Sequence, residues 1–312
     1  MAETPLKYWL KPFSRVVCFM LHSFILGKYP INNRKGVVIM TKKDTNFQSQ
    51  ASGLAKVWQR TPVLVKAILM TFLVGIVGAN GIGVISIALP PPVSLIAILA
   101  FLFLYWKFFS GSWGPKKTAE TRKKYFRAGS LSPTLWKWSL LLGMVFVLVF
   151  QSSLVVTFRL VQFPADLFDQ GFGFESLPLW MAWAFILLAA LSAALTEEVG
   201  FRGYAQVPLE ERYGPFLAII IISVLFVLFH LNQAWALPAM LQLFAAGLFS
   251  GAFAYASGSL LPGIIAHTLI DIVNFSYWWS DIAGKFEYQP IAITGVDLHF
   301  IVWLLIFAAS SA

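Results

Sequence analysis

Apolar residues lie in long continuous runs after residue 62, and short polar, Pro- or Gly-containing segments separate these runs. A helix needs about 20 apolar residues to cross the hydrocarbon core of a bilayer. The apolar runs begin at Val63, Val93, Ser139, Leu177, Phe216, Pro238, Leu261 and Leu298. Strands of a membrane β-barrel would instead alternate apolar and polar residues. The pattern therefore predicts an all-α polytopic membrane protein with about eight transmembrane helices.

The composition of the chain also indicates a membrane protein. Of its 312 residues, 58% are hydrophobic and only 12% are charged, whereas soluble domains carry roughly 25% charged residues. Cys18 is the only cysteine, so no internal disulfide can form. The first residues lack a short apolar core followed by small residues, and we expect no cleaved signal peptide.

The chain divides into three parts by charge and motif. Residues 1–61 are basic and form a cytoplasmic or interfacial region, in which residues 16–26 are an apolar segment too short to span. Residues 62–176 contain the first transmembrane helices and their loops. Residues 177–312 contain the remaining helices and the polar motifs, and we expect them to form a core around a central polar cavity.

Charge also predicts the orientation of the protein in its membrane. The loop 107–137 is rich in Lys and Arg, whereas the loop 160–178 contains only acidic charges. The positive-inside rule therefore places the N-terminus and the basic loop in the cytoplasm. The basic segments account for much of the +9 net charge. They set the topology and attract anionic lipid, with partner docking as an alternative; we expect no nucleic-acid binding.

Two adjacent glutamates interrupt an apolar run, in the segment TEEVGFRGY (residues 196–204). Glu198 and Arg202 are four residues apart, so they share a helix face and can form an ion pair. Glu197 is turned about 100° away from Glu198 on the same helix. The pair Glu198–Arg202 can therefore have a structural role while Glu197 projects elsewhere.

A histidine on the next apolar run is predicted to meet Glu197. Gly214 and Pro215 break the helical pattern between the two runs. Glu197 lies seventeen residues before Gly214, and His230 lies sixteen residues after it. In an antiparallel hairpin, both residues then lie about 25 Å from the turn, and the carboxylate and imidazole come level inside the membrane domain.

A third polar group lies in the segment AHTLIDIVNF. His267, Asp271 and Asn274 are spaced i, i+4 and i+7, which places them on one stripe of a helix. Counting from the turn at residues 257–260 puts His267 about 10 Å below His230 if both helices are straight. A tilt, a broken helix or a water-filled cavity would be needed to close that gap.

The six ionisable residues of these motifs indicate a functional site. Each Arg, Lys or Asp at the centre of a membrane costs about 2.5–3.5 kcal/mol on the lenient scale, so such residues are rarely only structural. Three classes fit: a hydrolase with a Glu- and His-activated water, a zinc enzyme, and a proton-coupled transporter. The sequence shows no inverted repeat of the kind found in transporters and no H-E-x-x-H zinc motif.

The ordered motifs resemble those of a known family. Glu197-Glu198-x-x-x-Arg202, Phe226-x-x-x-His230 and His267-x-x-x-Asp271 are similar to the motifs of CPBP intramembrane glutamic endopeptidases. This family includes type II CAAX prenyl proteases and bacteriocin-processing or self-immunity (Abi-like) proteins. The resemblance covers about residues 177–277.

The resemblance implies a role for each motif. Glu197 with His230 would activate the attacking water, and Glu198 and Arg202 would position the motif. His267 and the residue four positions later would stabilise the oxyanion. The prenyl proteases usually have Asn at that later position, whereas this chain has Asp271, which as a carboxylate cannot donate a hydrogen bond.

Asp271 would therefore act protonated or would orient His267, and Asn274, one turn further on, is an alternative donor. Phe226 is a further candidate for contact with substrate. The implied mechanism needs no cofactor, with zinc as the lesser alternative.

The substrate class is left open by these motifs. We expect a peptide or membrane-protein segment, lipidated or otherwise membrane-associated, and a bacterial inner or plasma membrane as the location. A non-catalytic scaffold, regulator or immunity protein is the alternative from a different class.

Overall fold

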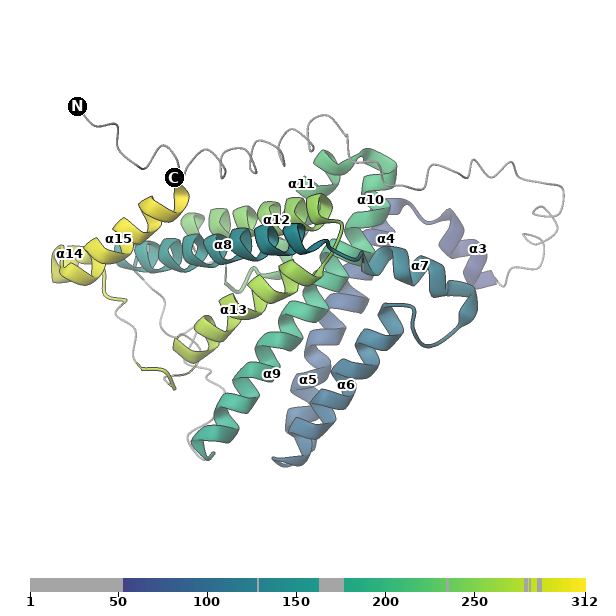
Figure 1. Ribbon diagram of the computed structural model, residues 1–312, viewed down its shortest axis with the longest axis horizontal. Coiled ribbons are helices and arrows are strands. Elements are labelled where there is room, and N and C mark those ends of the chain that lie inside the picture. Colours follow the sequence, from purple (N-terminus) through teal and green to yellow (C-terminus); the bar gives the residue numbers. More distant parts are fainter. Residues whose placement is uncertain are drawn as a thin grey trace. The chain divides into compact units, whose positions relative to one another are not determined.

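The computed structural model of the chain describes residues 53–127, 129–162, 177–233, 236–277, 280, 282–284 and 288–312 (Figure 1). The chain divides into two units, Met1–Pro62 and Val63–Ala312. In the first unit, the described part is a single helix, α3 (Gly53–Arg60). The predicted interfacial segment 16–26 lies outside the described residues, as does most of the acidic loop 160–178.

The second unit is built from helices throughout its described residues, which confirms the all-α prediction. Its N-terminal helices are α4 (Val63–Met70), η1 (Thr71–Ile76), α5 (Val77–Ala88), α6 (Val93–Phe109), α7 (Lys116–Phe126) and α8 (Pro133–Leu160). Then follow α9 (Leu179–Glu197), η4 (Glu198–Ala205), α10 (Gln206–Tyr213), α11 (Pro215–Phe229), α12 (Leu237–Ser257), α13 (Leu261–Tyr277), α14 (Ile291–Thr294) and α15 (Leu298–Ser311).

Each predicted apolar run corresponds to a helix or to a continuous series of helices. Four of these are long and apolar enough to cross a bilayer, namely Val63–Ala88, Pro133–Leu160, Leu179–Tyr213 and Leu237–Ser257. Three shorter apolar helices are α6, α11 and α15. The remaining run is α13, whose hydropathy is lowered by His267, Asp271 and Asn274. The protein is thus an integral membrane protein, and eight crossings remain a prediction.

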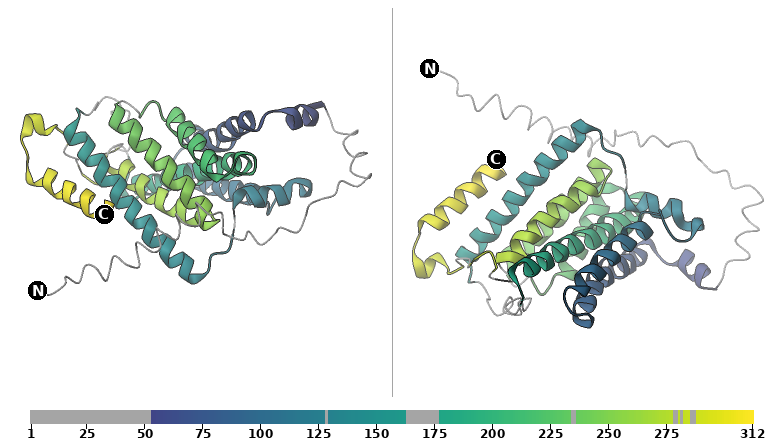
Figure 2. Two further views of the ribbon diagram at one scale, coloured as in Figure 1. Left: turned by 90° about the horizontal axis from the view of Figure 1, so that it is seen from above. Right: turned by 60° about the horizontal axis from the view of Figure 1, so that its bottom comes forward.

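Helix α8 begins earlier than the predicted start at Ser139. The Ser132 side chain accepts a hydrogen bond from the Leu135 N–H, and Pro133 occupies the first helical position, an arrangement that favours a helix start. The helix therefore runs for 28 residues. It packs against α12, α13 and α15, and these helices lie side by side in the views of Figure 2.

Two π-helical segments, η1 and η4, pack against each other in the centre of the unit. Their backbones approach so closely at Gly75 and Gly200 that a Cβ on Gly200 would lie 2.7 Å from Gly75 Cα. The Tyr105 hydroxyl of α6 donates a hydrogen bond to the Val74 carbonyl of η1. π-helical turns are frequent at functional sites, and η4 directly follows Glu197.

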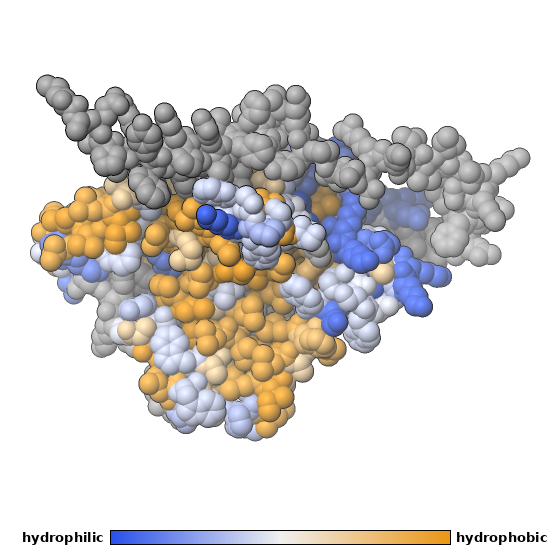
Figure 3. Space-filling view, viewed as in Figure 1, coloured by the Kyte–Doolittle hydropathy of each residue, from blue (hydrophilic) through white to orange (hydrophobic). Residues whose placement is uncertain are grey.

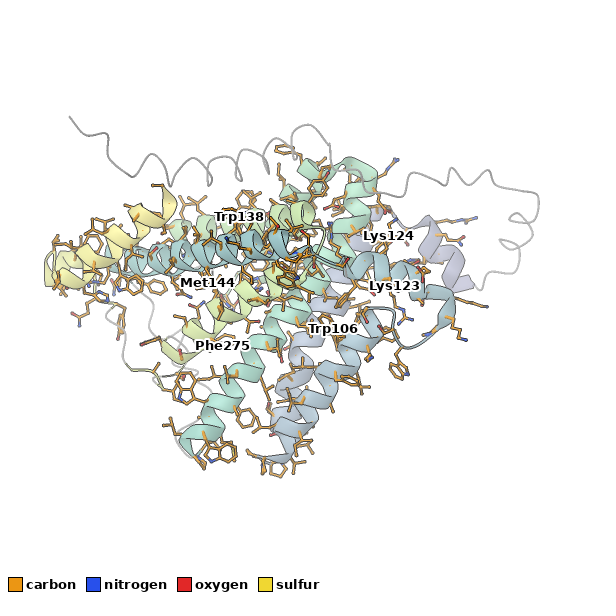
Figure 4. The ribbon with its side chains drawn as sticks, viewed as in Figure 1. Trp106, Lys123, Lys124, Trp138, Met144 and Phe275 are labelled. Atoms are coloured by element: carbon orange, nitrogen blue, oxygen red, sulfur yellow. The ribbon has the colours of Figure 1, made fainter. Side chains whose placement is uncertain are left out.

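The surface of the second unit separates apolar from charged residues (Figure 3). Hydrophobic residues cover the region of α5, α6 and α9, including the exposed side chains of Ile87, Ile96 and Phe103. Hydrophilic residues gather over α7, where Lys123 and Lys124 project from the helix (Figure 4). On its other face α7 is anchored by Phe126, whose ring packs edge-on against Trp106 of α6.

Candidate active site

The junction of α9 and η4 carries the Glu-Glu pair. Glu197 is the last residue of α9, and Glu198 begins η4. The close approach at Gly200 holds this junction against η1. Glu198 and Arg202 are each only 1% exposed, and Glu197 lies with its side chain 12% exposed on the side of a cavity.

Glu197 faces histidines from two other helices. Its Oε2 atom lies 3.7 Å from Nε2 of His230, at the end of α11, and 3.9 Å from Nε2 of His267, on α13. The helix series α9–η4–α10 turns at Gly214 and returns as α11, with α10 packed on α11. Glu197 and His230 therefore lie at the same level of the hairpin, as their similar distances in sequence from Gly214 predict.

His230 is oriented by the backbone of its own helix. Its Nδ1 lies 2.8 Å from the Phe226 carbonyl oxygen, which can only accept a hydrogen bond. Nδ1 therefore carries a proton, and Nε2 is the nitrogen directed at Glu197. The Phe226 ring also packs against the imidazole, with centroids 4.3 Å apart, and lies 4.6 Å from the Arg202 guanidinium. Phe226 thus supports two of the motif residues.

Glu198 has two partners. Its Oε1 atom lies 3.2 Å from Arg202 Nη1 and 3.1 Å from His267 Nδ1. The ion pair with Arg202 is the one expected from their spacing. The contact with His267 was not anticipated from the sequence, and it ties α13 to η4.

His267 is surrounded by three carboxylates. Besides Glu197 and Glu198, Asp271 places Oδ2 3.5 Å from His267 Nε2. The separation of about 10 Å that straight helices predict between His267 and the other motifs is absent. Helix α13 packs on α9 and α8. The turn before α13 therefore need not lie at the same level as the turn at Gly214, and distances counted from the two turns cannot be compared.

A cavity of about 110 Å³ joins these residues. Its wall includes Glu197, Arg202, His230, His267 and Asp271, together with both further candidates, Asn274 and Phe226. Glu197 Oε2 and Asp271 Oδ2 are buried and have no hydrogen-bond partner among the described residues. A buried polar atom without a partner is costly, so both atoms are available to a water or a substrate group.

The sequence motifs do not include several other residues that line the cavity or contact its wall. Phe146 and Phe150 of α8 and Phe275 of α13 line the apolar part of the wall, and Figure 4 shows Phe275 on α13. Gln151, next to Phe150, hydrogen-bonds Asn274. A glutamine within a long apolar run was the available signal, since polar residues inside membrane helices tend to be functional or to pair with other helices.

Within the described part of the chain, no group of three or more His, Cys, Asp or Glu side chains is arranged to hold a metal ion. Zinc remains the lesser alternative to be decided by experiment.

Comparison with known proteins identifies the region that carries this site. Residues 178–273 match the family described as type II CAAX prenyl endopeptidase Rce1-like. Residues 178–273 are thus similar to an Rce1-like domain. This match supports a membrane protease of the CAAX type at the level of the family. A search of curated proteins and a search of solved structures each gave no match.

The Rce1-like domain extends from the start of α9 to Val273, in the last third of α13. It includes all six ionisable motif residues. Helix α8 and Asn274 lie outside the matched residues, although both contribute to the cavity wall. The catalytic roles of the motif residues remain predictions.

Proposed function

We propose that the protein is an intramembrane endopeptidase that hydrolyses a peptide bond with a water activated by Glu197 and His230. The position of Glu197 Oε2 carries this proposal: it lies 3.7 Å from His230 Nε2 on the wall of the cavity. This separation exceeds a direct hydrogen bond of about 2.7–3.2 Å. A water can therefore hydrogen-bond both groups at once.

The hydrolysis requires one proton transfer in each direction. The water gives one proton to Glu197 and directs its other hydrogen to His230 Nε2, while its oxygen attacks the carbonyl carbon. The carbonyl electrons move onto oxygen to form a tetrahedral intermediate. Glu197 then returns the proton to the amide nitrogen as the C–N bond breaks, which leaves a carboxylic acid and an amine.

His267 is suited to stabilise the oxyanion of that intermediate. An imidazolium at this position donates from Nδ1 to Glu198 and from Nε2 into the cavity, and three carboxylates around it balance its charge. Asp271, as a carboxylate, orients His267. Asn274 supplies a second donor through its side-chain NH₂.

The apolar wall of the cavity favours a membrane-associated substrate. Four Phe rings line it, namely Phe146, Phe150, Phe226 and Phe275, and such walls bind apolar groups while a few polar residues fix orientation. We infer that the substrate is a peptide or membrane-protein segment with an apolar or lipidated residue beside the cleaved bond. This preference agrees with the CAAX-type family.

Peptide cleavage by the purified protein in detergent tests this function. The substrates are a quenched-fluorescent library that includes farnesylated CAAX peptides, with and without a zinc chelator, in water enriched in ¹⁸O. We expect chelator-resistant cleavage, one ¹⁸O atom in each new carboxylate, and loss of cleavage in Glu197→Gln. The matched control is Glu211→Gln, which removes a carboxylate that pairs with Lys124 away from the cavity.

Two results would indicate a different function. Cleavage abolished by the chelator would indicate a zinc protease. Absence of cleavage, together with a cellular phenotype that Glu197→Gln leaves unchanged, would indicate a scaffold or immunity protein.

Anionic lipid is the partner that we propose for α7. Lys116, Lys117 and Lys123 are exposed on this helix, and each basic residue near an anionic surface contributes about 1 kcal/mol. Replacing all three by Gln should reduce retention of phosphatidylglycerol in native mass spectrometry and leave phosphatidylcholine unaffected. Equal retention of both lipids by the wild type would contradict this role.

A further inference from the structure

Helix α8, which lies outside the Rce1-like domain, places a buried carboxamide against a residue of the cavity wall, Asn274. Gln151 is 6% exposed. Its Nε2 atom lies 3.1 Å from the Ile270 carbonyl oxygen and 3.0 Å from Asn274 Oδ1. Both partners belong to α13, which also carries His267 and Asp271.

The Ile270 carbonyl determines the orientation of both carboxamides. A main-chain carbonyl only accepts hydrogen bonds, so the Gln151 atom beside it must be the NH₂ nitrogen. That nitrogen only donates, so the Asn274 atom beside it must be the oxygen. The NH₂ group of Asn274 is consequently the end turned away from Gln151, and no residue in the described ranges accepts a hydrogen bond from it.

The NH₂ group of Asn274 has a use in the proposed reaction. Asn274 lines the same cavity as Glu197, His267 and Asp271. Because an ionised Asp271 cannot donate, a fixed NH₂ group supplies a donor that the Asp lacks. A carboxamide free to rotate would present its oxygen to an oxyanion part of the time, which would repel it.

We propose that Gln151 is a positioning residue, which holds Asn274 with its NH₂ group in the cavity as a hydrogen-bond donor to the oxygen of the scissile carbonyl. This inference rests on the proposed endopeptidase function. It assigns to α8 a part in the active site that the motifs of the Rce1-like domain do not contain.

A second glutamine offers a matched control. Gln242 of α12 also donates to α8, with Nε2 3.1 Å from the Phe150 carbonyl oxygen and 2.7 Å from Ser153 Oγ. Gln242 therefore joins two helices as Gln151 does, but without contacting Asn274. Replacing either glutamine by Met removes two interhelical hydrogen bonds and preserves the length of the side chain.

Steady-state kinetics on the best library peptide test the role in catalysis. We expect Gln151→Met to lower kcat on the order of 10- to 100-fold with little change in KM, because the lost interaction strengthens in the transition state. Gln242→Met should stay within about twofold of the wild type. In an Asn274→Ala background, Gln151→Met should have no further effect. Equal kcat in the two Met variants, or additive losses with Asn274→Ala, would overturn the proposal.

Nuclear magnetic resonance tests the orientation without any activity. The chain has six asparagines, so selective ¹⁵N-Asn labelling gives few side-chain NH₂ pairs, and Asn274→Ala identifies the relevant one. We expect one narrow pair for Asn274 in the wild type and in Gln242→Met, and a broadened pair in Gln151→Met. An unchanged narrow pair in Gln151→Met would overturn the positioning role. If the wild type cleaves no peptide, the proposed function fails, while these spectra still decide whether Gln151 fixes Asn274.

Discussion

His267 Nδ1 lies 3.1 Å from Glu198 Oε1, the same oxygen that lies 3.2 Å from Arg202 Nη1. The second glutamate of the Glu-Glu pair therefore joins a guanidinium on its own helical segment to an imidazole on α13. Its neighbour, Glu197, faces the cavity instead. Two adjacent carboxylates thus have different surroundings: Glu198 is buried against a guanidinium and an imidazole, and Glu197 lies on the cavity wall.

Glu198 is expected to be critical for stability because it is buried with Arg202. Glu198→Gln leaves a guanidinium that is 1% exposed without its charge partner, and breaking a buried ion pair in this way costs about 3–5 kcal/mol. Thermal unfolding in detergent should show a large decrease in Tm.

The double variant Glu198→Gln/Arg202→Met shows whether the Tm lost in Glu198→Gln comes from the unpaired charge or from altered packing. Removing both charges should restore much of the Tm lost in Glu198→Gln, because no buried charge is left unpaired. Activity should remain low in the double variant, since His267 loses its carboxylate partner. A double variant no more stable than Glu198→Gln would show that the ion pair is not the source of the loss.

The close packing of η1 against η4 depends more on Gly200 than on Gly75. A Cβ at Gly200 would lie 2.7 Å from both the N and Cα atoms of Gly75, whereas a Cβ at Gly75 would meet nothing closer than 3.6 Å. Gly200→Ala should therefore destabilise the protein by about 1–3 kcal/mol or more, and Gly75→Ala should stay within about 1 kcal/mol of the wild type. Chemical or thermal unfolding of the two variants, side by side, provides the measurement; equal losses would refute the geometry of the crossing.

The attachment of α15 to α8 is predicted to depend on pH. Arg159 of α8 is fully buried and donates hydrogen bonds to both carboxylate oxygens of Asp297, which caps α15. These hydrogen bonds, together with one from the Phe300 N–H, lower the pKa of Asp297 from its ordinary value. Stabilisation by this carboxylate is thus present above its unfolded pKa of about 3.9 and is lost as the pH falls through the lower folded pKa.

Comparison of the wild type with Asp297→Asn measures this effect directly. Asn keeps the ability to cap the helix but lacks the charge. The Tm of the wild type should exceed that of Asp297→Asn at pH 6, and the difference should shrink as the pH approaches 3. A difference that does not change with pH would exclude the carboxylate as its origin.

Much of the site could be predicted from spacing within single helices and across one turn. The four-residue spacing of Glu198 and Arg202 was sufficient to predict their ion pair, and equal distances from Gly214 were sufficient to bring Glu197 level with His230. Both relationships depend only on helix geometry and on the helix-breaking pair Gly214-Pro215.

Relationships between helices distant in sequence were harder to predict. The distance from His267 to Glu197 depends on how α13 packs against α8 and α9, which no periodicity encodes. The two π-helical segments meet at Gly75 and Gly200, which are 125 residues apart in the sequence. Gln151 carried a signal, as a polar residue in an apolar run, but its partner became evident only from the position of Asn274.

The joint action of Glu197 and His230 on one water is best measured by kcat/KM on one cleaved peptide. The variants are Glu197→Gln, His230→Gln and the double variant. General-base catalysis is worth about 10²- to 10⁴-fold, and groups that act as a unit give non-additive losses. We expect each single variant to lose activity in that range, the double variant to lose little more, and Glu211→Gln to remain active. A Glu197→Gln enzyme within tenfold of the wild type, or losses that multiply in the double variant, would contradict the account.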